Sequence, residues 1–121
     1  MSELPFAATT PVSVARVGLR ARDAESLAAY YRSVVGLQEL SRADGAITLG
    51  AANRPLLVLE PDASAKPDDP RSAGLFHTAF LLPSRADLGR WINHAAANQI
   101  GIGGASDHLV SEALYLTDPE G

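Results

Sequence analysis

Few side chains in this chain of 121 residues could bind a metal or move a proton. It has no Cys, which excludes disulfides, thiolate catalysis and Cys-bound zinc, so a metal would need His, carboxylate or Tyr ligands. Three histidines are present, His77, His94 and His108, and imidazole titrates near neutral pH. Tyr115 can donate its phenol hydrogen to an oxyanion. Chemistry therefore depends on which of these side chains the fold brings together.

Each candidate also has a purely structural interpretation. His77 could be a core histidine on a strand, and His108, which follows an Asp in a turn, could be a solvated or capping residue. His94 lies on the polar side of a predicted helix, which favours the surface. Tyr115 could simply line a core, and Glu60, which precedes a proline, could be a solvated strand end.

The elements that must position these residues occur twice in the sequence. The segment Val14–Tyr31 aligns with Leu75–Ile92, and both copies are typical of a strand, a capping residue and a helix. Asp23 corresponds to Ser84 at the two predicted helix starts. Such a repeat predicts two copies of one supersecondary unit, with a site expected in the space between them.

The first copy predicts a complete β-α-β-β-β module within residues 13–61. Apolar spacing predicts a helix over residues 24–35, ended by Gly36. Asp44-Gly45 is a hairpin signal, and a second turn is expected near Asn53. The strands are expected at residues 14–21, 37–42, 46–50 and 55–60. Residues 62–73 are polar and rich in proline, which predicts a linker between two modules of one domain.

The second module, residues 74–121, is predicted to be incomplete. Its first strand is expected at Leu75–Leu82, and Ser84 with Asp87 resembles a capping box at the start of a helix. Two further strands are expected at residues 100–106 and 112–117. By the repeat, a final strand is missing, which leaves backbone hydrogen-bonding groups unpaired along a sheet edge.

Composition narrows the class of partner. The formal charge is −4 and no basic run is present, so a nucleic-acid surface is not expected. No apolar run approaches the length of a membrane span, and the first residues lack the pattern of a signal peptide. We therefore expect a cytoplasmic protein that acts on small molecules.

Two segments carry a resemblance to a known family. GLFHTAFLLPSRADLGRW and GASDHLVSEALYLTDPEG are similar to the vicinal oxygen chelate superfamily of glyoxalases, bleomycin-resistance proteins and extradiol dioxygenases. Within it, they are most similar to the first half of catechol 2,3-dioxygenase-like proteins. The resemblance implies an α+β fold in which two βαβββ modules form a half-open, cup-shaped mixed sheet around a divalent metal.

The resemblance also implies a ligand set, of which this chain retains a part. Ring-cleaving members use two His and one Glu around Fe(II), and His77 falls where the family places one His. The repeat partner of His77 is Arg16, whose guanidinium cannot ligate a metal. The family's usual Glu lies in a strand after the final DPEG motif. Glu60 occupies the position of a metal-binding Glu in members that use both modules equally.

Two further roles are implied by position in the family pattern. His108 is similar to the residue that handles protons or steadies bound oxygen in ring-cleaving relatives, and Tyr115 to the phenol that hydrogen-bonds substrate. In a mechanism of this kind, His77 would be a ligand of the metal that binds the catecholate.

Three functions follow from these residues. The favoured one is a dioxygenase-like domain, weakly active or inactive on its own. The second is a metal-free module that sequesters a small aromatic or apolar molecule, in which Arg16 would attract an anionic ligand. The third is a glyoxalase-like lyase or isomerase that uses Glu60 and His77. The predicted open sheet edge makes the chain either a homodimer or part of a longer two-domain chain.

Overall fold

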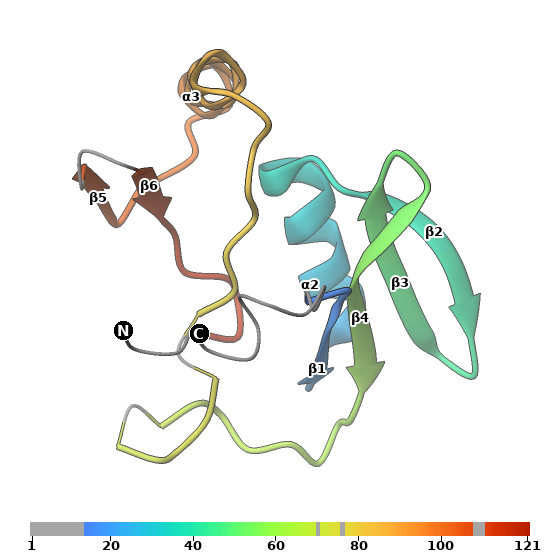
Figure 1. Cartoon of the computed structure of the whole chain (residues 1–121). Helices are drawn as coiled ribbons and strands as arrows, with labels where there is room; N and C mark the ends of the chain where they lie inside the picture. Colours follow the sequence, from blue (N-terminus) through green and yellow to red (C-terminus); the bar gives the residue numbers. More distant parts are fainter. Residues whose placement is uncertain (1–13, 70, 76, 108–110) are drawn as a thin grey trace, which may run out of the picture.

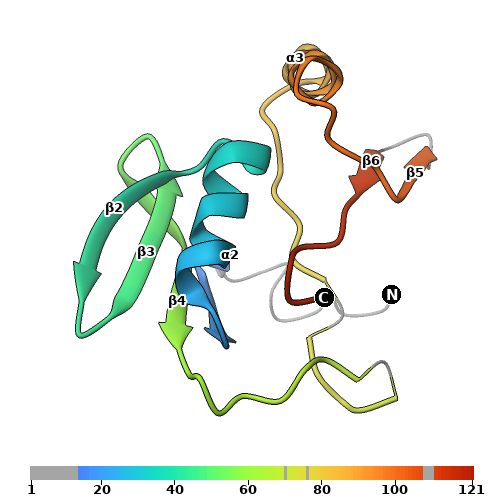
Figure 2. The same cartoon turned by 180° about the vertical axis from the view of Figure 1, so that it is seen from behind.

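The computed structural model describes residues 14–69, 71–75, 77–107 and 111–121. Two α/β modules lie side by side, and the helix of the first module lies between its own sheet and the second module (Figures 1 and 2). In this part of the chain, no helix is long and apolar enough to cross a membrane.

Module one has the predicted β-α-β-β-β order. Its elements are β1 (Val17–Ala21), α2 (Ala24–Tyr30), the π-helical turn η1 (Tyr31–Val35), β2 (Gln38–Ala43), β3 (Ala46–Ala51) and β4 (Arg54–Pro61). The sheet order is β1-β4-β3-β2, with β1 parallel to β4 and the other pairs antiparallel. The last strand of the module therefore lies between the first and the third.

Local signals set the boundaries of these elements. Asp23 caps α2, since its carboxylate accepts a hydrogen bond from the Ser26 backbone N–H at 3.1 Å. The predicted helix over residues 24–35 is confirmed, with its last turn in π geometry before Gly36 in the left-handed conformation. Asp44 and Gly45 both have positive φ, 53° and 82°, as the predicted tight hairpin requires.

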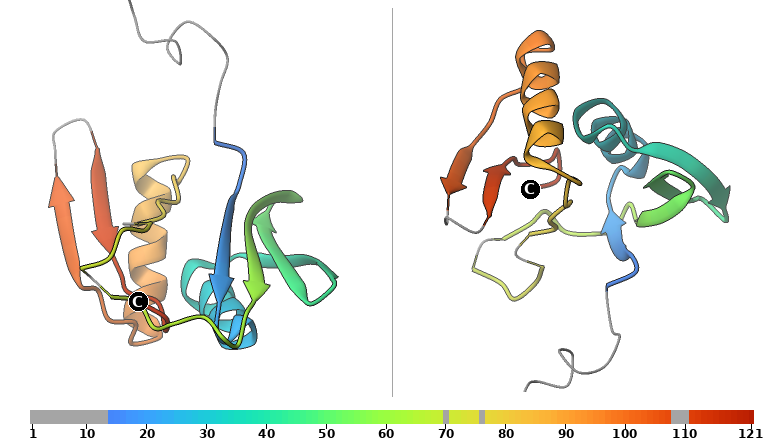
Figure 3. Two further views of the ribbon diagram at one scale, coloured as in Figure 1. Left: turned by 90° about the horizontal axis from the view of Figure 1, so that it is seen from below. Right: turned by 45° about the horizontal axis from the view of Figure 1, so that its top comes forward.

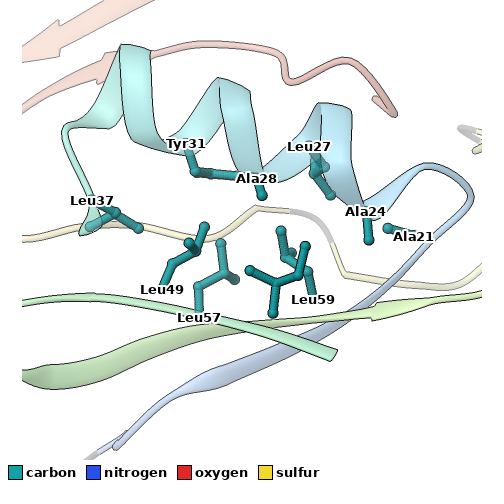
Figure 4. Close-up of a cluster of buried hydrophobic side chains, with 10 residues drawn as sticks. Ala21, Ala24, Leu27, Ala28, Tyr31, Leu37, Leu49, Leu57 and Leu59 are labelled. Atoms are coloured by element: carbon teal, nitrogen blue, oxygen red, sulfur yellow. The ribbon is translucent and has the colours of Figure 1, made fainter. Parts of the chain in front are cut away.

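The hydrophobic core lies between α2 and the sheet of module one (Figure 4). Alternate residues of β3 and β4 point toward the helix, and Leu49, Leu57 and Leu59 are completely buried there. Leu27 and Ala28 of α2 cover them. This burial holds the helix, and with it the residues of η1, in a fixed position on the sheet.

Module two contains the helix α3 (Arg85–Ala97) and a hairpin of β5 (Gly104–Asp107) and β6 (Glu112–Tyr115). Ser84 caps α3 by accepting from the Asp87 backbone N–H, which confirms the predicted helix start. Figure 3 shows α3 beside this hairpin, apart from the sheet of module one.

The predicted first strand of module two does not form a ladder. Within the described part of the chain, residues 77–82 pair with no other strand. The equivalent strand of module one, β1, is held by β4, and β4 has no counterpart among the described strands of module two. The expected strand at residues 100–106 also begins later, at Gly104, because the glycine-rich start of this segment stays outside the hairpin.

Candidate functional site

A cavity of about 1160 Å³ lies between the two modules. One wall is the α2–η1 helix of module one, and the opposite walls are residues 77–82, the start of α3 and residues 111–118 around β6. In Figures 1 and 2 the extended segment that leads to α3 runs between the module-one helix and the β5–β6 hairpin. The cavity therefore occupies the space between the repeats, where the sequence predicts a site.

Aromatic rings from both modules line the cavity. Tyr30 and Tyr31 meet edge to face, with ring centroids 5.4 Å apart, and Phe80 lies 6.0 Å from Tyr31. Trp91 on α3 also lines the cavity, and its indole N–H donates to the Val34 carbonyl oxygen at 2.8 Å. A planar apolar molecule would find ring faces and edges on several sides of this space.

His77 and Tyr115 both line this cavity. His77 is exposed and comes from the extended segment before α3, whereas Tyr115 ends β6 with 46% of its surface exposed. The Tyr115 hydroxyl lies 3.2 Å from the hydroxyl of Ser106 on the neighbouring strand β5. The fold therefore brings an imidazole and a phenol from two segments to one cavity.

A buried tyrosine adds a polar group that the sequence analysis did not identify. Tyr31 donates its hydroxyl hydrogen to the Asp118 carboxylate at 2.7 Å. Burial, followed by this hydrogen bond and the negative charge of Asp118, raises the pKa of Tyr31 well above its usual range. Burial and the Asp118 charge also raise the pKa of Tyr30. Both phenols therefore stay protonated, as donors, at neutral pH.

The turn that contains Asp118 docks onto the start of α2. The Glu120 carboxylate accepts hydrogen bonds from the backbone N–H groups of Arg22 and Asp23, at 2.7 and 3.0 Å. The DPEG motif thus fixes the end of module two to the first turn of the module-one helix. Spacing could not predict these partners, because they lie almost a hundred residues apart in the sequence.

The remaining predicted site residues lie elsewhere. Arg16 is exposed just before β1 and lies outside the cavity, although Arg20 lines it and pairs with Asp62 at 3.6 Å. Glu60 is exposed near the end of β4 and also lies outside the cavity. Leu57 and Leu59 point toward α2, so alternation places Glu60 on the opposite face of the strand. His108 lies outside the described residues.

The donor set of an iron site can be compared with these positions. A two-His, one-carboxylate site needs three donors around one point. Among residues 14–69, 71–75, 77–107 and 111–121, the structure groups no three His, Asp or Glu side chains in a way that could hold a metal ion. The described residues therefore do not fit an Fe(II) centre, and the ligand roles of His77 and Glu60 stay predictions.

Comparisons with known proteins agree with this architecture. Residues 13–121 match the family model of the glyoxalase/bleomycin resistance protein/dioxygenase superfamily. Over 105 residues, or 85% of its length, the chain is 43% identical to the catechol-2,3-dioxygenase of Bacillus subtilis, and the match covers 36% of that protein. The chain thus spans about a third of that relative.

Solved structures share the fold at low identity. Lactoylglutathione lyase from Agrobacterium tumefaciens aligns with a TM-score of 0.68 at 23% identity, covering 92% of this chain and 89% of the other. A glyoxalase/dioxygenase from Nostoc punctiforme aligns with a TM-score of 0.65 at 18% identity, covering 99% and 91%. The α+β architecture, the repeated modules and the family match lead to one conclusion: the chain belongs to the glyoxalase/bleomycin resistance protein/dioxygenase superfamily.

Proposed function

We propose that this chain is the small-molecule-binding module of an extradiol ring-cleaving dioxygenase-type protein, and that it cleaves catechols weakly or not at all by itself. One observation carries the proposal. His77 and Tyr115 line one cavity, in a chain that is 43% identical over 105 residues to a catechol-2,3-dioxygenase. The resemblance in sequence and the convergence of polar groups on one cavity support the same class of ligand.

The proposed ligand is a planar aromatic molecule with adjacent oxygens. Tyr30, Phe80 and Trp91 offer ring contacts to its apolar body. Tyr115 would donate a hydrogen bond to one oxygen, and His77 would face another from the extended segment before α3. His108 remains the predicted acid or base for proton transfer.

Weak activity is proposed because the described residues supply an incomplete donor set. A divalent metal is the expected cofactor in this superfamily, and Fe(II) is the predicted ion for its ring-cleaving members. Without three donors around one point, an ion held by His77 alone would bind loosely. A partner or a longer chain would have to add donors for full activity.

The test combines metal binding with turnover. The chain, His77→Ala and Asn93→Ala are titrated with Fe(II) by calorimetry under anaerobic conditions, then assayed with catechol and O2 for ring-cleavage product. Asn93 is the control because it is an exposed polar residue on α3 outside the cavity lining. We expect weak Fe(II) binding and slow turnover that disappear in His77→Ala and persist in Asn93→Ala.

Other results would contradict the proposal. Equal turnover in His77→Ala and the parent chain would show that His77 takes no part in the reaction. A kcat above about 1 s⁻¹, within the ordinary range of enzymes, would contradict weak activity. Absence of both catechol binding and turnover would overturn the assignment as a whole.

Metal-free sequestration of an aromatic compound is a second candidate. The aromatic lining of the cavity favours it, together with the lack of a three-donor cluster among the described residues. Calorimetric titration of catechol and of an aromatic hydrocarbon probe in the presence of EDTA distinguishes the two functions. Equal affinity with and without a chelator would favour sequestration. The lyase alternative needs Glu60 beside His77, but Glu60 lies outside the cavity that His77 lines.

Location and assembly belong to the same proposal. We propose that the protein acts in the cytoplasm, which subcellular fractionation would test. We also propose that it works either as a homodimer or as part of a longer two-domain chain. Sedimentation analysis of the 121-residue chain separates these two states, because only the first makes the mass depend on protein concentration.

A further inference from the structure

The Asp118 carboxylate lies in the wall of an aromatic cavity without a cationic partner. Asp118 lines the cavity and is half-buried. Within the part of the chain that the structure describes, no Lys, Arg or His forms a salt bridge with it. A charge that is partly removed from water needs hydrogen bonds or an opposite charge to offset the lost hydration. Asp118 therefore depends on its hydrogen bonds, or on a ligand, to offset its charge.

Hydrogen bonds fix both oxygens of this carboxylate and still leave it able to accept more. One oxygen accepts from the Tyr31 hydroxyl at 2.7 Å, and the other accepts from the Glu120 backbone N–H at 2.8 Å. Both of these donors are neutral. A carboxylate offers about four lone-pair sites, so roughly half of them are engaged here. The carboxylate is thus held in place, negatively charged and open to a donor from a ligand.

Aromatic rings lie beside this carboxylate. The ring of Tyr31, which donates to Asp118, lies 5.4 Å from that of Tyr30 and 6.0 Å from that of Phe80. Burial raises the pKa of both Tyr30 and Tyr31, and the Asp118 charge adds to the rise in each, so this charge lies near both phenols. Aromatic faces attract an ammonium group within about 6 Å, and a carboxylate accepts its hydrogen bonds. The rings and the carboxylate together therefore suit an amine.

Two of the three Arg and Lys residues in the described cavity lining are paired with other carboxylates. Arg20 pairs with Asp62 at 3.6 Å, and Arg85 pairs with Glu112 at 2.9 Å. The third, Lys66, lines the cavity from the exposed connector between the modules. Lys66 is thus the residue that would favour an anionic ligand instead.

The amine-binding residues lie within reach of those proposed to bind the catechol oxygens. Asp118 follows Tyr115 by three residues along the chain, and Phe80 follows His77 by three. Three residues span at most about 11 Å, even when fully extended. All four side chains line the same cavity. This span suits a catechol ring with a short alkyl chain that ends in an amine.

We propose that the cavity selects aromatic molecules that carry a protonated amine, which Asp118 binds together with the rings of Tyr30 and Phe80. This ligand class rests on the proposed function, because it makes the ligand an aminoalkyl catechol whose oxygens lie at His77 and Tyr115. The amine donates a hydrogen bond to Asp118 and supplies the opposite charge. An aminoalkyl catechol is therefore preferred over a neutral or an acidic catechol of similar size.

Matched ligands and matched variants test the proposal. Dopamine, ethylcatechol and dihydroxyphenylacetate share the catechol ring and differ in the charge of the side chain, whereas phenethylammonium has the amine without the oxygens. Each is titrated by calorimetry, at neutral pH with EDTA, into the parent chain, Asp118→Asn and Asp44→Asn. Asp118→Asn removes the charge but keeps an oxygen that can accept from Tyr31. Asp44→Asn makes the same change at an exposed turn outside the cavity lining.

We expect the parent chain to bind dopamine about tenfold more tightly than ethylcatechol, the effect of one hydrogen bond to a charged group. This preference should disappear in Asp118→Asn and persist in Asp44→Asn. The comparison of ligands needs only the parent chain, so the proposal stays testable where Asp118→Asn folds poorly.

Three results would overturn the proposal and leave the proposed function intact. The first is equal affinity for dopamine and ethylcatechol. The second is tighter binding of dihydroxyphenylacetate than of dopamine, which would assign the charge preference to Lys66. The third is a preference for dopamine that a folded Asp118→Asn retains. In contrast, binding of phenethylammonium that depends on Asp118, without binding of any catechol, would support the amine site and contradict the proposed function.

Discussion

The hydrogen bond from Tyr31 to Asp118 should contribute to stability through its link between the modules. Tyr31 is only 7% exposed and its hydroxyl lies 2.7 Å from the Asp118 carboxylate. The substitution Tyr31→Phe keeps the ring and its contacts with Tyr30 and Phe80 but removes the donor. Asp118 then remains partly buried with one partner fewer.

The magnitude follows from the charge and the burial. A hydrogen bond to a charged group contributes about 1.5–3 kcal/mol. Asp118 is only partly buried, so water replaces some of the lost interaction, and we expect a loss of about 1.5–2 kcal/mol in the free energy of unfolding. For a domain of this size that corresponds to a decrease of roughly 5–8 °C in the melting temperature.

The contact also has a pH signature. The pKa of Tyr31 is higher in the folded state than its ordinary value near 10, so its contribution is complete below about pH 10. Above that pH the unfolded chain loses the proton first, and stability decreases as pH rises toward the folded-state pKa. Tyr31→Phe should therefore lose less stability than the parent chain between neutral and alkaline pH.

The assay is urea unfolding followed by circular dichroism at neutral and alkaline pH. Tyr30→Phe is the matched control, because it loses a hydroxyl on the adjacent ring without removing the donor to Asp118. Equal stability of the two variants at neutral pH would refute the assigned contact. An unchanged alkaline loss in Tyr31→Phe would refute the assigned titration.

Three further perturbations test the fold. Leu59→Ala, at a completely buried site, should cost about 2–5 kcal/mol in urea unfolding. Gly50→Ala would place a Cβ against the Arg54 carbonyl oxygen of β4, well inside van der Waals contact, and should abolish folding as measured by circular dichroism. Gly89→Ala, on α3 where a Cβ meets open space, should add about 1 kcal/mol to the free energy of unfolding. Hydrogen bonds from Ser26 lower the pKa of the Asp23 carboxyl. The contribution of this cap to stability is therefore present above the unfolded-state pKa near 4 and is lost as pH falls further. Acid unfolding of Asp23→Asn, compared with the parent chain, tests this.

Local chemistry explains which parts of the fold could be predicted. Asp23 and Ser84 cap their helices through side chains that reach only three residues ahead. Gly36 and the Asp44-Gly45 turn depend on backbone conformations that few other residues adopt. Such signals lie within a few residues of the structure that they specify, so one sequence was enough to identify them.

Non-local pairing explains what could not be predicted. The alternation in residues 77–82 is typical of a strand, but a strand forms only where a neighbour supplies its ladder. The repeat makes Arg16 the partner of His77, yet Arg16 lies before the first paired residue of β1, Val17, and outside the cavity. Spacing alone could not identify the Tyr31–Asp118 contact, whose partners lie 87 residues apart.

Two sets of polar contacts explain how a module with little core keeps its place. At one end, Trp91 donates to the Val34 carbonyl, and His94 Nε2 lies 2.8 Å from the Ser33 carbonyl, so that nitrogen carries the hydrogen. Carbonyl oxygens of the π-helical turn thus accept hydrogen bonds from two side chains of α3. Elsewhere on this helix, the Glu120 carboxylate accepts from the backbone N–H of Asp23 at its start, and the Asp118 carboxylate accepts from the Tyr31 hydroxyl near its middle.

Both sets attach to the same helix, which the core of module one holds firmly. The walls that carry His77 and Tyr115 are therefore positioned by module one rather than by packing within module two. The cavity between the modules is thus placed by the core of module one, because the contacts of Trp91, Asp118 and Glu120 fix module two to that helix.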